Sequence, residues 1–75
     1  MAVNWCYWEP TVFRRRDLAS VARPHDERGE PVRAYWLAWP PFISAHTLRE
    51  VTSLRFKTAV DAMEFIDARW PIQDR

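Results

Sequence analysis

The side chains that could do chemistry in this chain are few and widely separated. Cys6, His25 and His46 are its only soft metal ligands, and they lie roughly twenty residues apart instead of in the close pairs that zinc sites use. Any cysteine–histidine catalytic pair would need the same three residues, and Cys6 stands in an apolar stretch typical of a packed, inert thiol. We therefore expect no metal site and no cofactor.

Acidic residues gather in one stretch, RPHDERGEP at 23–31. Asp26, Glu27 and Glu30 alternate there with arginines, and no pocket-forming side chains are near. This pattern favours an exposed loop tip over a general acid/base pair. Gly29 is the only glycine, so a glycine-rich phosphate loop is excluded. We expect the protein not to be an enzyme.

Arginine and aromatic residues are the types in which the chain is rich. Phe13 is followed by three arginines, Arg14, Arg15 and Arg16. This composition is typical of surfaces that hold single-stranded nucleic acid, and the alternative interpretation is a solvated strand edge. The 11 basic and 10 acidic residues give a net charge of only +1, which provides no global positive field. All the basic residues except Lys57 are arginine, which stacks on aromatic rings at interfaces, although a GC-rich genome would produce the same bias.

The chain length permits one domain, residues 1–75. A chain of 75 residues buries only about 60% of the surface that it exposes when unfolded. Cys6 has no partner for an internal disulfide, so stability must come from large aromatic side chains or from association. The lone cysteine also indicates a reducing compartment. The start, MAVNWCYWEP, does not look like a signal peptide, and no apolar run approaches the ~18 residues of a membrane span. We expect a cytoplasmic protein without membrane contact.

Alternation of apolar and polar residues predicts an antiparallel sheet of three to four strands. The expected strands are about 3–8, 12–21, 32–39 and 48–56. Two of them carry an alternative: 12–21 fits neither a strand nor a helix cleanly, and 48–56 could begin with a one-turn helix capped by Thr47, with Glu50 three residues on.

The clearest predicted element is a helix at about 59–69. Thr58 and Asp61 match the spacing in which a hydroxyl and a carboxylate cap the free amides of a helix start. One apolar stripe about 100° wide follows, and Pro71 ends the run. The stripe comprises Ala59, Ala62, Met63, Ile66 and Trp70. The sequence therefore predicts an α+β fold in which this helix packs on one face of the sheet.

The junction FKTAVDAMEFID, at 56–67, resembles the strand-to-helix junction of integrase arm and AP2-like DNA-binding domains. In those domains a strand ends in an aromatic residue and a threonine caps the next helix. The resemblance implies a sheet-plus-helix fold. That family reads DNA with a basic sheet, whereas the strands here carry Tyr35, Trp36 and Trp39.

One helix of ~11 residues, ~17 Å long, covers one face of such a sheet, yet aromatic residues occupy both faces. We expect the helix to pack on the face that carries Trp36, because the flanking small residues Ala34 and Ala38 let it approach. Unless the link at 42–47 folds over it, the other face is an exposed contact surface. The expected binding residues are Trp8, Tyr35, Leu37 and Trp39, with Arg14, Arg15 and Arg16.

These features predict a non-enzymatic module that binds a larger protein through this aromatic and arginine-bearing face. Small proteins of this kind are often inhibitors carried by phages or mobile elements, anti-CRISPR proteins among them, or accessory subunits of larger assemblies. A homodimer formed sheet to sheet would cover the same face. The alternative function is a small nucleic-acid-binding module that uses the segment Phe13–Arg16 together with the sheet aromatics.

Overall fold

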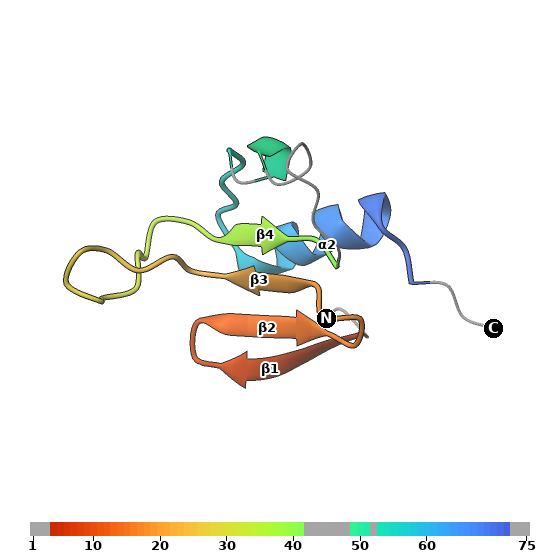
Figure 1. The fold of residues 1–75 in the computed structure, drawn as a ribbon, viewed down its shortest axis with the longest axis horizontal. Helices are drawn as coiled ribbons and strands as arrows, with labels where there is room; N and C mark the ends of the chain where they lie inside the picture. Colours follow the sequence, from red (N-terminus) through yellow and green to blue (C-terminus); the bar gives the residue numbers. More distant parts are fainter. Residues whose placement is uncertain (1–3, 42–48, 52, 73–75) are drawn as a thin grey trace.

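A four-stranded sheet with one helix behind it forms the fold (Figure 1). The computed structural model describes residues 4–41, 49–51 and 53–72. The strands follow one another across the sheet in chain order, and every neighbouring pair is antiparallel. The expected α+β fold, an antiparallel sheet with a C-terminal helix on one face, is confirmed. Its elements are β1 Trp5–Glu9, β2 Val12–Arg15, β3 Ser20–Ala22, β4 Leu37–Trp39 and α2 Ala59–Arg69.

Helix α2 has the bounds that its sequence predicts. The hydroxyl of Thr58 accepts a hydrogen bond from the backbone N–H of Asp61 at 3.0 Å, so the expected cap is present. At the other end, Trp70 donates its N–H to the carbonyl of Ile66, and Pro71 follows directly. These local signals explain why this element is well specified by the sequence.

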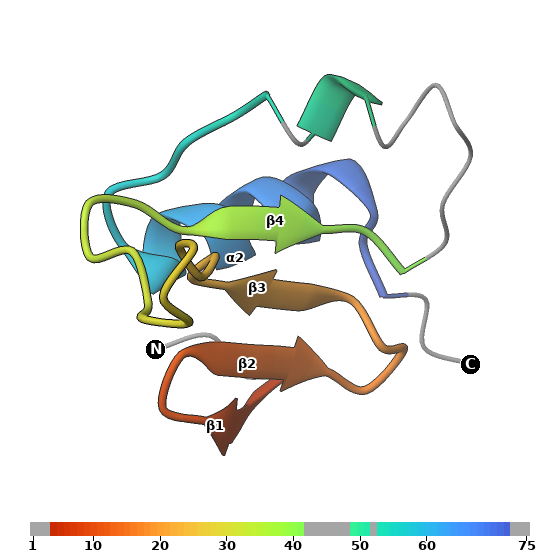
Figure 2. The ribbon, with the colours of Figure 1, turned by 60° about the vertical axis from the view of Figure 1, so that its left-hand side comes forward.

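The core lies between α2 and the β3–β4 half of the sheet (Figures 1 and 2). Ala62, Met63 and Ile66 of the predicted stripe are buried, and the helix packs against Val21, Trp36 and Ala38. Trp36 and Ala38 are thus on the helix side, as expected. Ala34 is not, because it lies exposed in the loop before β4.

The expected single strand at 12–21 is wrong, because the chain reverses direction within it. β2 and β3 form a tight hairpin around Arg16, Asp17 and Leu18, closed by hydrogen bonds from Leu18 N–H to Arg15 O and from Arg15 N–H to Ala19 O. Leu18 takes the left-handed conformation, φ 74°, that completes this three-residue turn type. Glycine or asparagine usually marks that position, so the sequence carries no turn signal there.

The expected strand at 48–56 is also wrong. Residues 49–51 form a helical turn, in agreement with the one-turn alternative, although Thr47 and Leu48 lie outside the described residues. Among the described residues of this segment, 49–51 and 53–56, only Phe56 joins the sheet, through two backbone hydrogen bonds with Trp36 of 2.7 and 3.1 Å. Glu50 forms an ion pair with Arg69, which holds this segment to α2.

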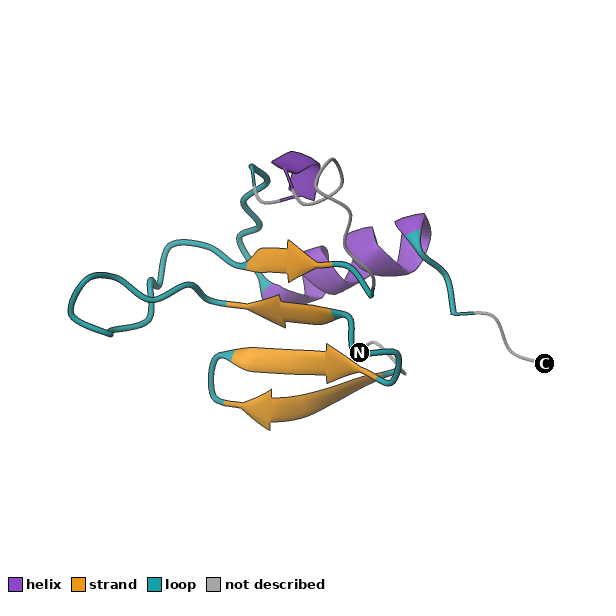
Figure 3. Cartoon of the chain, in the orientation of Figure 1, coloured by secondary structure: helices purple, strands orange, loops and turns teal. Residues whose placement is uncertain are grey.

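The other two strands differ from expectation at their ends. β1 continues through Glu9, and Val3, where it was expected to start, lies outside the described residues. β4 is confined to 37–39, because the chain bends at 33–34 and only isolated bridges, one of them at Pro31, precede the strand. Loops therefore connect short strands (Figure 3).

Candidate functional site

The strand register assigns each sheet residue to one of two faces. Side chains alternate along a strand, and residues that are opposite one another share a face. Trp5, Phe13, Val21 and Ala38 lie on the side of α2, and in Figure 1 that helix is behind the sheet. No described helix or strand covers the opposite side, which we call the open sheet face. Its residues are Cys6, Trp8, Glu9, Val12, Arg14, Ser20, Ala22, Leu37 and Trp39.

A stacked pair occupies one half of the open sheet face. The guanidinium carbon of Arg14 lies 4.4 Å from the ring centroid of Trp8, whose side chain is 55% exposed. The contact is a cation–π interaction, which favours this relative placement of the two side chains. The Nε atom of Arg14 is buried without a hydrogen-bond partner, so this arrangement keeps one donor unused.

Leu37 and Trp39 of β4 occupy the other half. Both are half-buried, and Trp39 stands opposite Ser20, in the same row as Arg14. Tyr35 precedes β4, and the guanidinium of Arg55 stacks on its ring at 4.6 Å. The structure therefore brings Trp8, Arg14, Leu37 and Trp39 onto one face and places Tyr35 just before its edge. Whether the link at 42–47 crosses this face lies outside the described residues.

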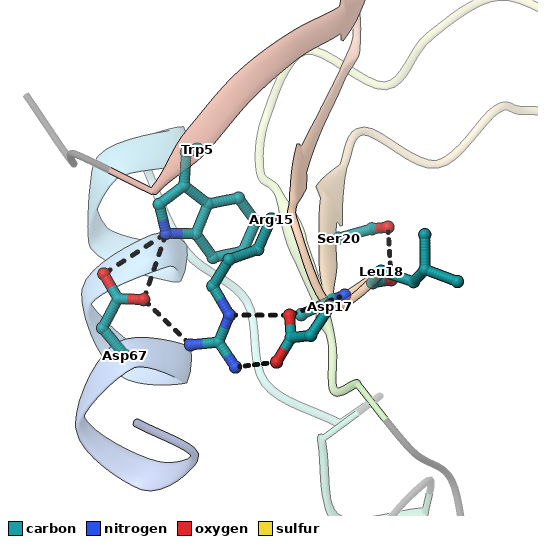
Figure 4. Close-up of polar contacts among 7 residues, drawn as sticks. Trp5, Arg15, Asp17, Leu18, Ser20 and Asp67 are labelled. Atoms are coloured by element: carbon teal, nitrogen blue, oxygen red, sulfur yellow. Dashed lines mark hydrogen bonds and ion pairs between the residues drawn. The ribbon is translucent and has the colours of Figure 1, made fainter. Parts of the chain in front are cut away.

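Arg15, expected among the binding residues, is on the helix side and is only 2% exposed. Its guanidinium donates two hydrogen bonds to Asp17, at 2.9 and 2.8 Å, and one to Asp67 of α2, at 3.0 Å (Figure 4). Asp67 also accepts the indole N–H of Trp5 at 3.1 Å. Arg15 can be buried because carboxylate partners compensate its charge. Through Asp67 these contacts link β1, β2 and α2. Arg15 is thus a structural residue and is withdrawn from the open sheet face.

These contacts shift the pKa values of Arg15 and Asp17. Hydrogen bonding to Asp17 raises the pKa of Arg15 above its ordinary value, against the opposing effect of burial. The same bonds lower the pKa of Asp17, again against burial. Both groups are therefore charged at neutral pH and hold the hairpin closed.

Sequence reasoning missed this cluster. Asp67 lies off the apolar stripe of the helix, which indicated a solvent-facing residue, and it is 52 positions away from Arg15 in the chain. One signal was present: Asp17 stands two residues after Arg15, the spacing with which its carboxylate reaches back to that guanidinium. The third arginine, Arg16, is exposed in the turn, so the arginine run divides among three environments.

The other candidate chemical groups remain dispersed. Asp26 is occupied by its own loop, where it accepts the backbone N–H groups of Arg28 and Glu30 at 2.9 and 3.0 Å. Cys6 and His25 are exposed on separate parts of the fold, and His46 lies outside the described residues. Across residues 4–41, 49–51 and 53–72, no group of three or more metal-ligating side chains comes together.

Comparisons of the chain with protein-family models, curated proteins and solved structures found no match. Among the described residues, no helix has the length and apolar character needed to cross a membrane.

Proposed function

We propose that the chain is a non-enzymatic protein-interaction module that binds a larger partner through the open sheet face. The observation that carries the proposal is the Trp8–Arg14 stack, at 4.4 Å, on the same face as Leu37 and Trp39. Tryptophan and arginine are the residues in which binding energy concentrates at protein interfaces.

The chemistry of the face indicates the kind of partner surface that it fits. Trp8, Leu37 and Trp39 offer apolar area, and Arg14 is a planar cation already stacked in position. An arginine of this kind suits a carboxylate, to which it can donate in bidentate geometry. A partner surface with apolar side chains around an Asp or Glu therefore complements this face.

Nucleic-acid binding by Phe13–Arg16 is the second candidate, and the geometry of this segment favours it less. Phe13 packs on the helix side against Tyr7 and Trp36, with ring centroids 5.9 Å apart in each case. Arg15 is buried beneath α2. The segment therefore does not present a continuous row of cations and stacking rings to one strand of nucleic acid.

The biological roles that suit such a module are those expected of small binding proteins. One is inhibition of a host or defence protein by a phage or mobile element, the anti-CRISPR type included. The other is service as an accessory subunit. The lone, exposed Cys6 supports a proposed site of action in a reducing compartment such as the cytoplasm.

Affinity capture tests the proposal. Tagged wild type, Trp39→Ala and the control Val60→Ala would be incubated with nuclease-treated lysate of the source cells, and retained proteins identified by mass spectrometry. Val60 is an exposed apolar residue of α2, away from the open sheet face. One stoichiometric protein retained by wild type and Val60→Ala, but lost with Trp39→Ala, is the expected result.

Salt separates the two functions. Binding through an apolar face should persist as ionic strength rises, whereas phosphate contacts release counterions and weaken steeply. If nucleic acid were recovered without nuclease treatment, and no protein were retained after nuclease treatment, nucleic-acid binding would replace protein binding as the proposed function.

A further inference from the structure

The outer edge of β1 carries backbone groups that no described residue pairs. In the β2–β3 hairpin, Arg15 donates its N–H to the β3 side, and Thr11 accepts from Arg23 on that same side. Backbone groups of successive residues in an antiparallel strand alternate between the two neighbouring strands. Arg14 must therefore direct its N–H and C=O toward β1, where it meets Cys6.

The same alternation orients the backbone of β1. Because Cys6 is bonded toward β2, its neighbours Trp5 and Tyr7 direct their N–H and C=O groups away from the sheet. The opposite edge of the sheet, at β4, is partly paired within the chain. The backbone of Trp36, just before β4, is hydrogen-bonded to Phe56.

Residues 5–7 of this edge lack the features that usually protect such a strand, because the β-bulge of β1 lies beyond them, between Tyr7 and Glu9. Edge strands are commonly blocked by lysine, proline or an inward-facing charge. The segment 5–8 contains no charged residue and no proline; Glu9 is the only charge in β1, and the register shift lies between Tyr7 and Glu9. Tyr7 is 64% exposed on one side of the strand and Trp8 55% on the other.

We propose that this edge pairs with β1 of a second copy of the chain, antiparallel and centred on Cys6, to make one continuous sheet through both copies. In this register Trp5 of each copy lies opposite Tyr7 of the other, and all their outward N–H and C=O groups are bonded. A register centred on Tyr7 leaves the groups of Trp5 opposite the irregular end of the strand, at Glu9.

The charge arrangement favours a second copy as the occupant. The antiparallel two-fold arrangement keeps the two Glu9 side chains at opposite ends, so no like charges lie opposite one another. Full burial of an aromatic side chain covers about 150–250 Å². Covering the exposed part of Tyr7 in both copies would remove roughly 250 Å² from water, with the paired backbone in addition. Since stable interfaces bury about 1,200–2,000 Å² in total, we expect a reversible, concentration-dependent dimer.

Sedimentation velocity over a wide concentration range tests the association. Wild type should approach twice the 9.0 kDa mass of the chain as concentration rises. Tyr7→Pro should remain monomeric with an unchanged circular dichroism spectrum, because the lost N–H points away from β2 and proline is tolerated at such edge positions. Tyr7→Val, which keeps the N–H, should still associate. A monomeric wild type would overturn the proposal and leave the edge to a strand of another protein. A dimer that survives Tyr7→Pro would overturn it equally.

Cross-linking tests the register independently of that variant. Cys6 of each copy would face the other in a non-hydrogen-bonded pair, with Cα atoms about 4.5 Å apart. A short bis-maleimide should therefore join wild-type chains through Cys6. The control, Cys6→Ser with Ser20→Cys, moves the thiol two strands inward along the same row, about 10 Å in each copy. Equal cross-linking of control and wild type would contradict the Cys6-centred register.

Discussion

Replacing Asp67 with alanine should cost the fold about 2 kcal/mol. The Asp67 carboxylate accepts the Nη1–H of Arg15 at 3.0 Å and the indole N–H of Trp5 at 3.1 Å. Hydrogen bonds to charged groups contribute about 1.5–3 kcal/mol each. The Asp67 side chain is 39% exposed, so water replaces part of this contribution, and Arg15 keeps both bonds to Asp17. The expected loss for both bonds together is therefore about 2 kcal/mol, near the low end of the range for a single such bond.

Thermal unfolding measures this cost. For a domain of this size about 1 kcal/mol changes Tm by roughly 4–8 °C, so Asp67→Ala should lower Tm by about 8–16 °C. The matched control is Glu64→Ala, an exposed carboxylate on the same helix, whose effect should stay within about 0.5 kcal/mol. If the two variants unfolded at the same temperature, the cluster would not hold the hairpin to α2.

Three further outcomes are expected. First, Leu18→Gly should stabilise the fold by roughly 0.5–1 kcal/mol, because leucine at φ 74° is strained, whereas Gly29→Ala, at φ 82°, should destabilise it by a similar amount; urea titrations that give the same sign for both would contradict this. Second, the pKa of Asp17 is lower in the folded chain than its ordinary 3.8, so its stabilisation is present above about pH 4 and is lost as pH falls through the folded value. Asp17→Asn should flatten that acid limb in a Tm-versus-pH series. Third, Met63→Asp should abolish the cooperative unfolding transition, because Met63 is buried in the core and an unpaired carboxylate there is strongly unfavourable.

Local signals made part of this fold predictable. The bounds of α2 followed from the Thr58 cap, the apolar stripe and Pro71, all of which act within a few residues. Strict alternation also predicted that Leu37 and Trp39 share a face, since a strand fixes side-chain direction by parity. Neither inference required knowledge of distant parts of the chain.

The remainder depended on tertiary contacts or on an unusual backbone. The β2–β3 turn places leucine where glycine is expected, so residue type gave no warning of the reversal. The burial of Arg15 depends on Asp67, which folding brings from a distant part of the chain. Phe56 pairs with Trp36 through a single bridge, which is too short to leave a periodic pattern.

The most direct test of the proposed binding face compares two adjacent aromatic residues of β1. Trp8 lies on the open sheet face and Tyr7 on the helix side, and both are more than half exposed. The dissociation constant of the purified captured protein would be measured for wild type, Trp8→Ala and Tyr7→Ala by calorimetry. An interface hot spot contributes about 2 kcal/mol or more, so Trp8→Ala should weaken binding at least about 30-fold, while Tyr7→Ala should change it less than about fivefold. Equal losses, or a larger loss with Tyr7→Ala, would contradict the assignment of the partner to the open sheet face.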